Sequence, residues 1–69
     1  MINKEYLKKL ILYQFGSMRN LSRELGISER TIYGWFRTNS TIPIHKLELI
    51  LNKIDIDIDK DKLFILERN

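Results

Sequence analysis

Apolar residues recur at helical spacing along most of this chain. Near the start, Leu7, Leu10 and Ile11 lie three and four positions apart, which is the spacing of one face of an amphipathic helix. Asn3 precedes this pattern and is a residue type that commonly caps helix N-termini. The pattern therefore predicts a first helix over residues 4–14.

Two shorter helices are predicted next, over residues 18–25 and 29–37. Ser17 and Ser28 precede them and are favourable N-cap residues. Gly26 lies just past the first of the pair, where the chain needs a left-handed backbone that glycine adopts without steric cost. Two short helices joined through such a glycine are typical of a helix-turn-helix, which sets its second helix into the major groove of DNA.

A fourth helix is predicted after the polar loop over residues 38–41. Pro43 suits the first turn of that helix, because its missing N–H would have no partner there anyway. The apolar positions that follow form one stripe that we expect to be buried: Ile44, Leu47, Ile50, Leu51 and Ile54.

The C-terminal residues allow two interpretations. Residues 54–58 alternate isoleucine and aspartate, which indicates a strand, and residues 63–66 then form the second strand of a hairpin. Alternatively, Asp59 caps a fifth helix with Leu63, Phe64 and Leu66 facing inward. We favour the helix, so the predicted fold is all-α, with four or five short helices in a single domain over residues 1–69.

The charge is unevenly distributed. The formal net charge is +3, but residues 1–37 hold seven Lys and Arg against three Glu, whereas residues 38–69 hold five against six acidic residues. The basic half is the half with the helix-turn-helix pattern, as expected of a face that binds a polyanion. The chain has no cysteine and no apolar run near the ~20 residues that span a bilayer, so we expect a cytoplasmic protein with no membrane partner.

The segment over residues 15–43 resembles the helix-turn-helix of the Cro/repressor family (Cro/C1 type) of phage and bacterial regulators. It reads FGSMRNLSRELGIS, then ERTIYGW, then IP, and it is most similar to small phage Cro proteins. The resemblance implies a lambda-repressor-like fold. It also implies that the first turn of the recognition helix meets base edges, while the start of the preceding helix and the following loop bind phosphates.

Carried over by position, the resemblance assigns two sets of DNA contacts. The base-contacting set is Glu29, Arg30, Tyr33 and Gly34. The phosphate-contacting set is Ser17, Met18, Arg37, Thr38, Asn39, Ser40 and Thr41. Lys46 is a further phosphate-contacting candidate for a different reason, since it lies at the start of the fourth helix, where backbone N–H groups can assist. The chain departs from the family at Met18, where many relatives have a hydrogen-bonding Gln, and at Gly34, where a longer polar side chain is common. Glycine removes a base reader there but lets the backbone approach a thymine methyl group.

Arg30 is the strongest base reader by chemistry, because a guanidinium can donate two hydrogen bonds to guanine O6 and N7. The alternative is an Arg30 that is solvated, or paired with Glu29 or Glu24. Glu29 can accept from a cytosine amino group, or it can simply be favoured by the helix dipole. Tyr33 can reach DNA or act as a packing residue.

Residue spacing and composition argue against a metal site and against catalysis. Asp55, Asp57, Asp59 and Asp61 alternate, but an EF-hand loop counted from Asp57 would need Gly and Glu at two positions that hold Lys62 and Arg68. We therefore expect no metal and no cofactor. One His, no Cys and no phosphate-binding glycine loop also predict that the protein is not an enzyme.

These patterns together predict a sequence-specific double-stranded DNA-binding protein, a transcriptional repressor of the phage or mobile-element type. A domain this small offers few base contacts and no room for an effector domain, so we expect a homodimer on a palindromic operator and no small-molecule effector. The expected dimer surface is apolar and consists of Phe36, Ile56, Ile58, Leu63 and Leu66. Two alternatives stay open: a DNA-anchoring module of a larger recombinase or homing endonuclease, and a helix-turn-helix protein-interaction module such as an antitoxin or anti-repressor.

Overall fold

The protein is an all-α fold of short helices, as predicted. The computed structural model describes residues 2–37 and 39–64. These residues form α1 (Lys4–Phe15), α2 (Met18–Leu25), α3 (Glu29–Trp35), α4 (Ile44–Lys53) and α5 (Lys60–Leu63). In this part of the chain the one β feature is an isolated antiparallel bridge between Ile2 and Phe64. Residues 60–63 form the fifth helix that we favour, and residues 65–66 of the alternative second strand lie outside the described residues.

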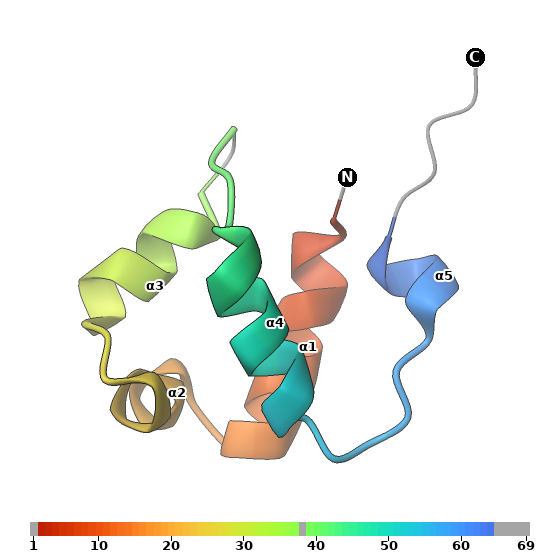
Figure 1. Cartoon of the computed structure of the whole chain (residues 1–69), viewed down its shortest axis with the longest axis horizontal. Helices are drawn as coiled ribbons and strands as arrows, with labels where there is room; N and C mark the ends of the chain where they lie inside the picture. The colour runs from red at the N-terminus through yellow and green to blue at the C-terminus, as the bar shows by residue number, and fades with distance from the viewer. Residues whose placement is uncertain (1, 38, 65–69) are drawn as a thin grey trace.

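The helices are arranged along the longest axis of the molecule (Figure 1). The α2–α3 pair lies at one end and α5 lies at the other, with α1 and α4 between them. α1 packs against both α2 and α5, and α2 packs against α3. The predicted recognition helix α3 is therefore held at one extremity, away from the acidic segment that leads to α5.

Side-chain caps begin four of the helices. Asn3 Oδ1, Ser17 Oγ and Ser28 Oγ each accept a hydrogen bond from the backbone N–H three residues later, at 3.1, 3.1 and 3.2 Å. Asp59 Oδ1 accepts from two N–H groups of α5. Each cap satisfies donors that the first turn leaves without partners. α4 lacks a side-chain cap, since Pro43 occupies its N-cap position and not its first turn.

The turn between α2 and α3 depends on Gly26. Its backbone has φ 65° and ψ 31°, the left-handed conformation that the sequence predicts. Its N–H and the next N–H, of Ile27, both donate to the Ser22 carbonyl, which ends α2 within one residue. Ile27 then packs against the core, so the turn is attached to the rest of the protein.

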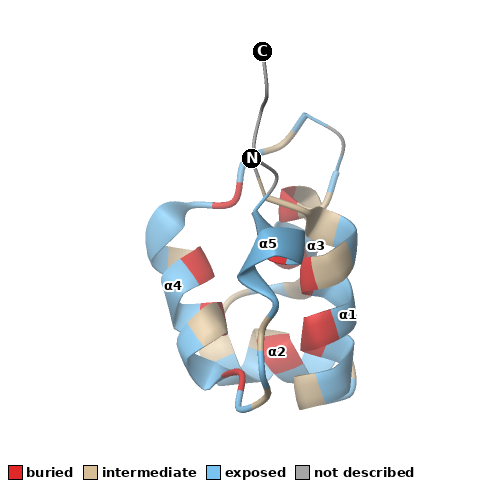
Figure 2. Ribbon diagram, turned by 90° about the vertical axis from the view of Figure 1, so that its right-hand side faces the viewer, coloured by how far each residue is buried: buried red, intermediate tan, exposed pale blue. Residues whose placement is uncertain are grey.

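The core fills the space where the helices face one another. Figure 2 shows the buried segments of α1 and α4 on the sides turned towards each other. Each element and the loop before α4 contribute to this core, whose buried members are Leu7, Leu10, Ile11, Met18, Leu21, Ile32, Trp35, Ile42, Leu47, Ile50, Ile54 and Leu63.

Besides the position of Pro43, three details of the predicted elements are wrong. α3 ends at Trp35 and not at residue 37. Ile44 was expected in the core but is 61% exposed, because it starts α4 at the edge of the molecule and the loop residue Ile42 fills the core instead. Phe64 was expected to face inward but is 41% exposed, since the chain becomes extended there and pairs with Ile2. Leu66, the third residue expected to face inward, lies outside the described residues.

Candidate nucleic-acid interface

The outer face of α3 carries polar side chains opposite its buried face. Ile32 and Trp35 point into the core, at 0% and 8% exposure. Arg30 and Tyr33 lie three positions apart on the opposite face, and both are exposed. Arg37 is also exposed, two residues beyond the end of α3. A helix with one face in the core and the other in solvent can enter a groove without unfolding any part of the domain.

Gly34 lies on this outer face between the two arginines. A Cβ atom built on Gly34 meets no heavy atom within 4 Å, so the space above the backbone is open. Tyr33 beside it is 49% exposed, which leaves its ring free of the core. The open backbone at this position is what a close approach to a base edge requires.

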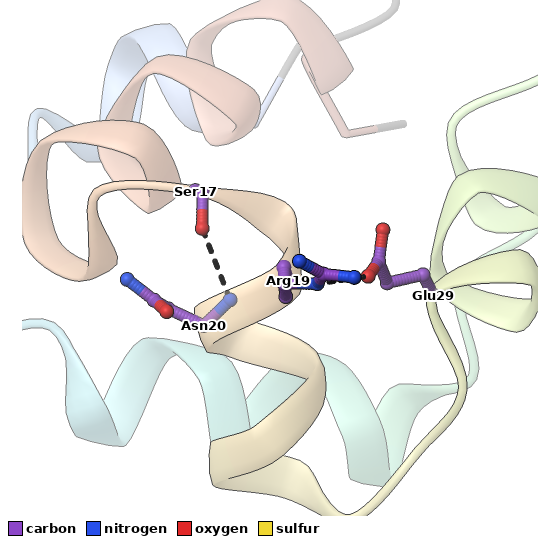
Figure 3. Close-up of polar contacts among 4 residues, drawn as sticks. All are labelled: Ser17, Arg19, Asn20 and Glu29. Carbon is purple, nitrogen blue, oxygen red and sulfur yellow. Dashed lines mark hydrogen bonds and ion pairs between the residues drawn. The ribbon is translucent and has the colours of Figure 1, made fainter.

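Glu29, the first residue of α3, is ion-paired with a residue of α2. Its Oε1 accepts a hydrogen bond from Arg19 Nε at 3.2 Å, across the gap between the first turns of α2 and α3 (Figure 3). The other ion pair within the described residues joins Lys53 to Glu24 at 3.6 Å. Both carboxylates that could have paired with Arg30 are thus paired with other residues.

The start of α2 contributes less to phosphate binding than predicted. Ser17 Oγ is half-buried and occupied as the acceptor of the Asn20 N–H (Figure 3). Met18 is 3% exposed and belongs to the core. Its side chain cannot reach a phosphate, because its spacing from Leu21 places both on the inner face of α2.

The loop after α3, which here means residues 37–41, is braced from a distant helix. Lys4 Nζ on α1 donates to the Arg37 carbonyl at 2.9 Å and also to the Ser40 carbonyl. Asn39 adopts a left-handed backbone with φ 66°, and the Ser40 N–H donates back to the Arg37 carbonyl at 3.2 Å. Lys4 thus holds the backbone at Arg37 and Ser40, at two points between α3 and α4.

The predicted phosphate-binding residues of this loop differ in exposure. Arg37, Asn39 and Thr41 are exposed, whereas Ser40 is half-buried. Thr38 lies outside the described residues. Lys46, in the first turn of α4, is half-buried. The exposed members of the set belong to the connection that leaves the C-terminal end of α3 (Figure 1).

The sequence analysis did not predict the roles of two residues in this region, the Arg19 ion pair with Glu29 and the Lys4 hydrogen bonds to the loop. A signal existed for Arg19: a basic residue in the first turn of a helix opposes the helix dipole, and α2 has no acidic residue there to offset it. Such a placement indicates an anionic partner elsewhere. Lys4 gave no signal, because its acceptors lie 33 and 36 residues away in the sequence.

The predicted apolar dimer surface is mostly not exposed. Leu63 is 1% exposed within the core, so a second subunit cannot cover it. Phe36, Ile56 and Ile58 are half-buried and pack against the core. Leu66 lies outside the described residues. Leu63 is therefore not part of a dimer surface, and Phe36, Ile56 and Ile58 are the remaining described candidates for dimer contacts.

Within residues 2–37 and 39–64 no three His, Asp or Glu side chains are grouped as metal ligands. No helix among the described residues has the length and apolar character needed to cross a bilayer. Comparison of the chain with family models, with curated proteins and with solved structures finds no match.

Proposed function

We propose that the protein binds double-stranded DNA in a sequence-specific manner and acts as a transcriptional repressor of the phage or mobile-element type. The observation that carries the proposal is the outer face of α3, where the exposed Arg30 precedes the open backbone of Gly34 by one helical turn, with the exposed Arg37 just beyond the helix end. The resemblance of residues 15–43 to the Cro/repressor helix-turn-helix supports the same function. So does the position of this face at the end of the molecule remote from α5 (Figure 1).

In this proposal α3 enters the major groove with its outer face towards the base edges. Arg30, which has no ion-pair partner within 4 Å among the described residues, donates both arms of its guanidinium to a guanine. Arg37, Asn39 and Thr41 bind phosphates on one side of the groove. Repression follows from occlusion of the polymerase by the domain bound at its operator.

We further propose a homodimer on a palindromic operator, with half-sites about 34 Å apart. The support is physical: one recognition helix of seven residues offers few base contacts. Sedimentation at micromolar concentration, alone and with a duplex of two half-sites, tests the dimer. Substitution of Leu63 by a charged residue is unsuitable as a test, since it would place the charge in the core.

The decisive experiment is selection of bound duplexes from a random pool with the wild type and with Arg30→Ala. Arg23→Ala serves as the matched control, because it removes the same charge from α2, where Arg23 lies near Gln14 and Lys53. We expect an enriched palindrome that loses one G·C preference in Arg30→Ala, with about 1–3 kcal/mol of discrimination lost, and keeps it in Arg23→Ala.

Other outcomes separate the alternatives. Binding that is steeply salt-dependent but enriches no sequence indicates a DNA-anchoring module of a larger protein. No binding to any duplex refutes the proposal and indicates a protein-interaction module. If the wild type and Arg30→Ala enrich the same site, the protein is a sequence-specific DNA-binding protein in which Arg30 does not read a base.

A further inference from the structure

The ion pair between Arg19 and Glu29 joins the two first turns that face the proposed DNA (Figure 3). The side chain of Arg19 is 71% exposed and that of Glu29 is 39% exposed. An ion pair with this exposure contributes little to stability, typically below about 1 kcal/mol. Its structural consequence is a bias in orientation: it favours the direction in which the Arg19 side chain reaches Glu29.

The geometry of the pair leaves most of the guanidinium free. Only Nε of Arg19 bonds to Glu29. The two terminal nitrogens carry four further N–H donors in a rigid planar fork, which suits a phosphate. The 71% exposure of the Arg19 side chain leaves these terminal donors accessible from solvent while the carboxylate bonds to Nε. Met18, the neighbour expected to contact DNA, is turned into the core.

We propose that Arg19 is a phosphate-binding residue of this protein and that Glu29 is a positioning residue that orients it, not a reader of bases. The proposal rests on the DNA-binding function proposed above. The chemistry it invokes is a charge-assisted contact between a pre-oriented guanidinium and the DNA backbone near the start of α2. Pre-orientation lowers the entropic cost of immobilising a long side chain on binding.

The test compares two substitutions at Glu29, with and without Arg19. Glu29→Ala and Glu29→Gln both remove the negative charge, so both relieve repulsion of the phosphates equally. Only Gln keeps an oxygen that can accept from Arg19 Nε. We expect Glu29→Ala to bind the selected duplex at least threefold more weakly than Glu29→Gln. In the Arg19→Ala background the two variants should bind equally.

Arg19→Ala itself should lower affinity about tenfold and reduce the slope of log K against log salt by about one. Arg23→Ala, on the same helix, should change the affinity much less. Circular dichroism should show that all variants keep the wild-type helix content, since both side chains are on the surface.

The outcomes distinguish this proposal from the function on which it rests. If the wild type binds a duplex but Arg19→Ala matches Arg23→Ala in affinity and salt slope, the phosphate contact is wrong. A lost preference at one base pair in both Glu29 variants would make Glu29 a reader and overturn its positioning role. If the wild type binds no duplex, the proposed function fails, and the role of Arg19 fails with it.

Discussion

Alanine in place of Gly34 is expected to stabilise the protein and, in the same variant, to weaken DNA binding. Gly34 is helical, with no positive φ, and a Cβ atom added there meets nothing within 4 Å. The substitution therefore costs no steric strain. It restricts the unfolded chain and raises helix propensity, which together contribute about 0.5–1 kcal/mol.

Gly26→Ala is the matched control for this prediction. Its Cβ atom would also meet nothing within 4 Å, so neither variant introduces a clash, and the backbone conformation decides the sign of the effect. At φ 65° an alanine costs about 1–2 kcal/mol, of which the restricted unfolded chain offsets a part. We expect Gly26→Ala to be destabilising by roughly 1 kcal/mol and Gly34→Ala to be stabilising.

Thermal and urea unfolding, followed by far-UV circular dichroism and Trp35 fluorescence, measure both variants. In a domain of this size Gly34→Ala should raise Tm by about 2–8 °C, while Gly26→Ala should lower it. Equal shifts in the two variants would refute the argument from backbone conformation. The affinity of Gly34→Ala for the selected duplex should fall about tenfold despite the gain in stability. An unchanged affinity would mean that the α3 backbone does not approach the DNA at this position.

Three further predictions follow from the described contacts. Lys4→Met should lower DNA affinity and speed amide exchange in the loop after α3, because it removes the two hydrogen bonds to that loop. Lys8→Met, which removes the same charge from the exposed side of α1, should do neither. Equal effects in the two variants would mean that Lys4 acts only through its positive charge. Ser28→Ala should reduce the free energy of unfolding by about 1 kcal/mol, because the first turn of α3 loses its cap; an unchanged urea midpoint would contradict this. Leu63→Ala should be destabilising by about 2–5 kcal/mol, and Phe64→Ala by less than half as much, since only Leu63 is fully buried; the order of the two Tm values tests the burial.

The parts of the fold that the sequence predicts well are set by local interactions. Asn3, Ser17, Ser28 and Asp59 each cap a helix through an N–H two or three residues away, so the residue type and its position suffice. The left-handed conformation of Gly26 is local in the same sense. Short-range chemistry of this kind does not depend on what packs against the helix.

The features that were mispredicted depend on distant parts of the chain. Ile44 fits the apolar stripe of α4, yet the core next to it is filled by Ile42 from the preceding loop, outside the helical period. Met18 fits a phosphate-binding position by resemblance, but the packing of α2 buries it. Arg19 could have been suspected from its unfavourable place at a helix start, whereas its partner, ten residues away, is known only from the packing of α2 on α3.

α1 lies outside the helix-turn-helix, but residues at its two ends form hydrogen bonds with the loop after α3 and with the segment that follows α4. Lys4 holds the loop after α3, and the preceding residue, Asn3, donates its N–H to the Leu63 carbonyl at 2.6 Å. At the other end of the helix, Gln14 Oε1 accepts the Asp55 N–H at 2.9 Å. Because consecutive residues bond to the loop and to the tail, we expect a change that loosens the tail to weaken the Lys4 hydrogen bonds as well. The recognition surface is therefore a property of the whole domain, and a short segment bearing α2 and α3 alone would keep the caps but lose the brace that sets the course of the loop.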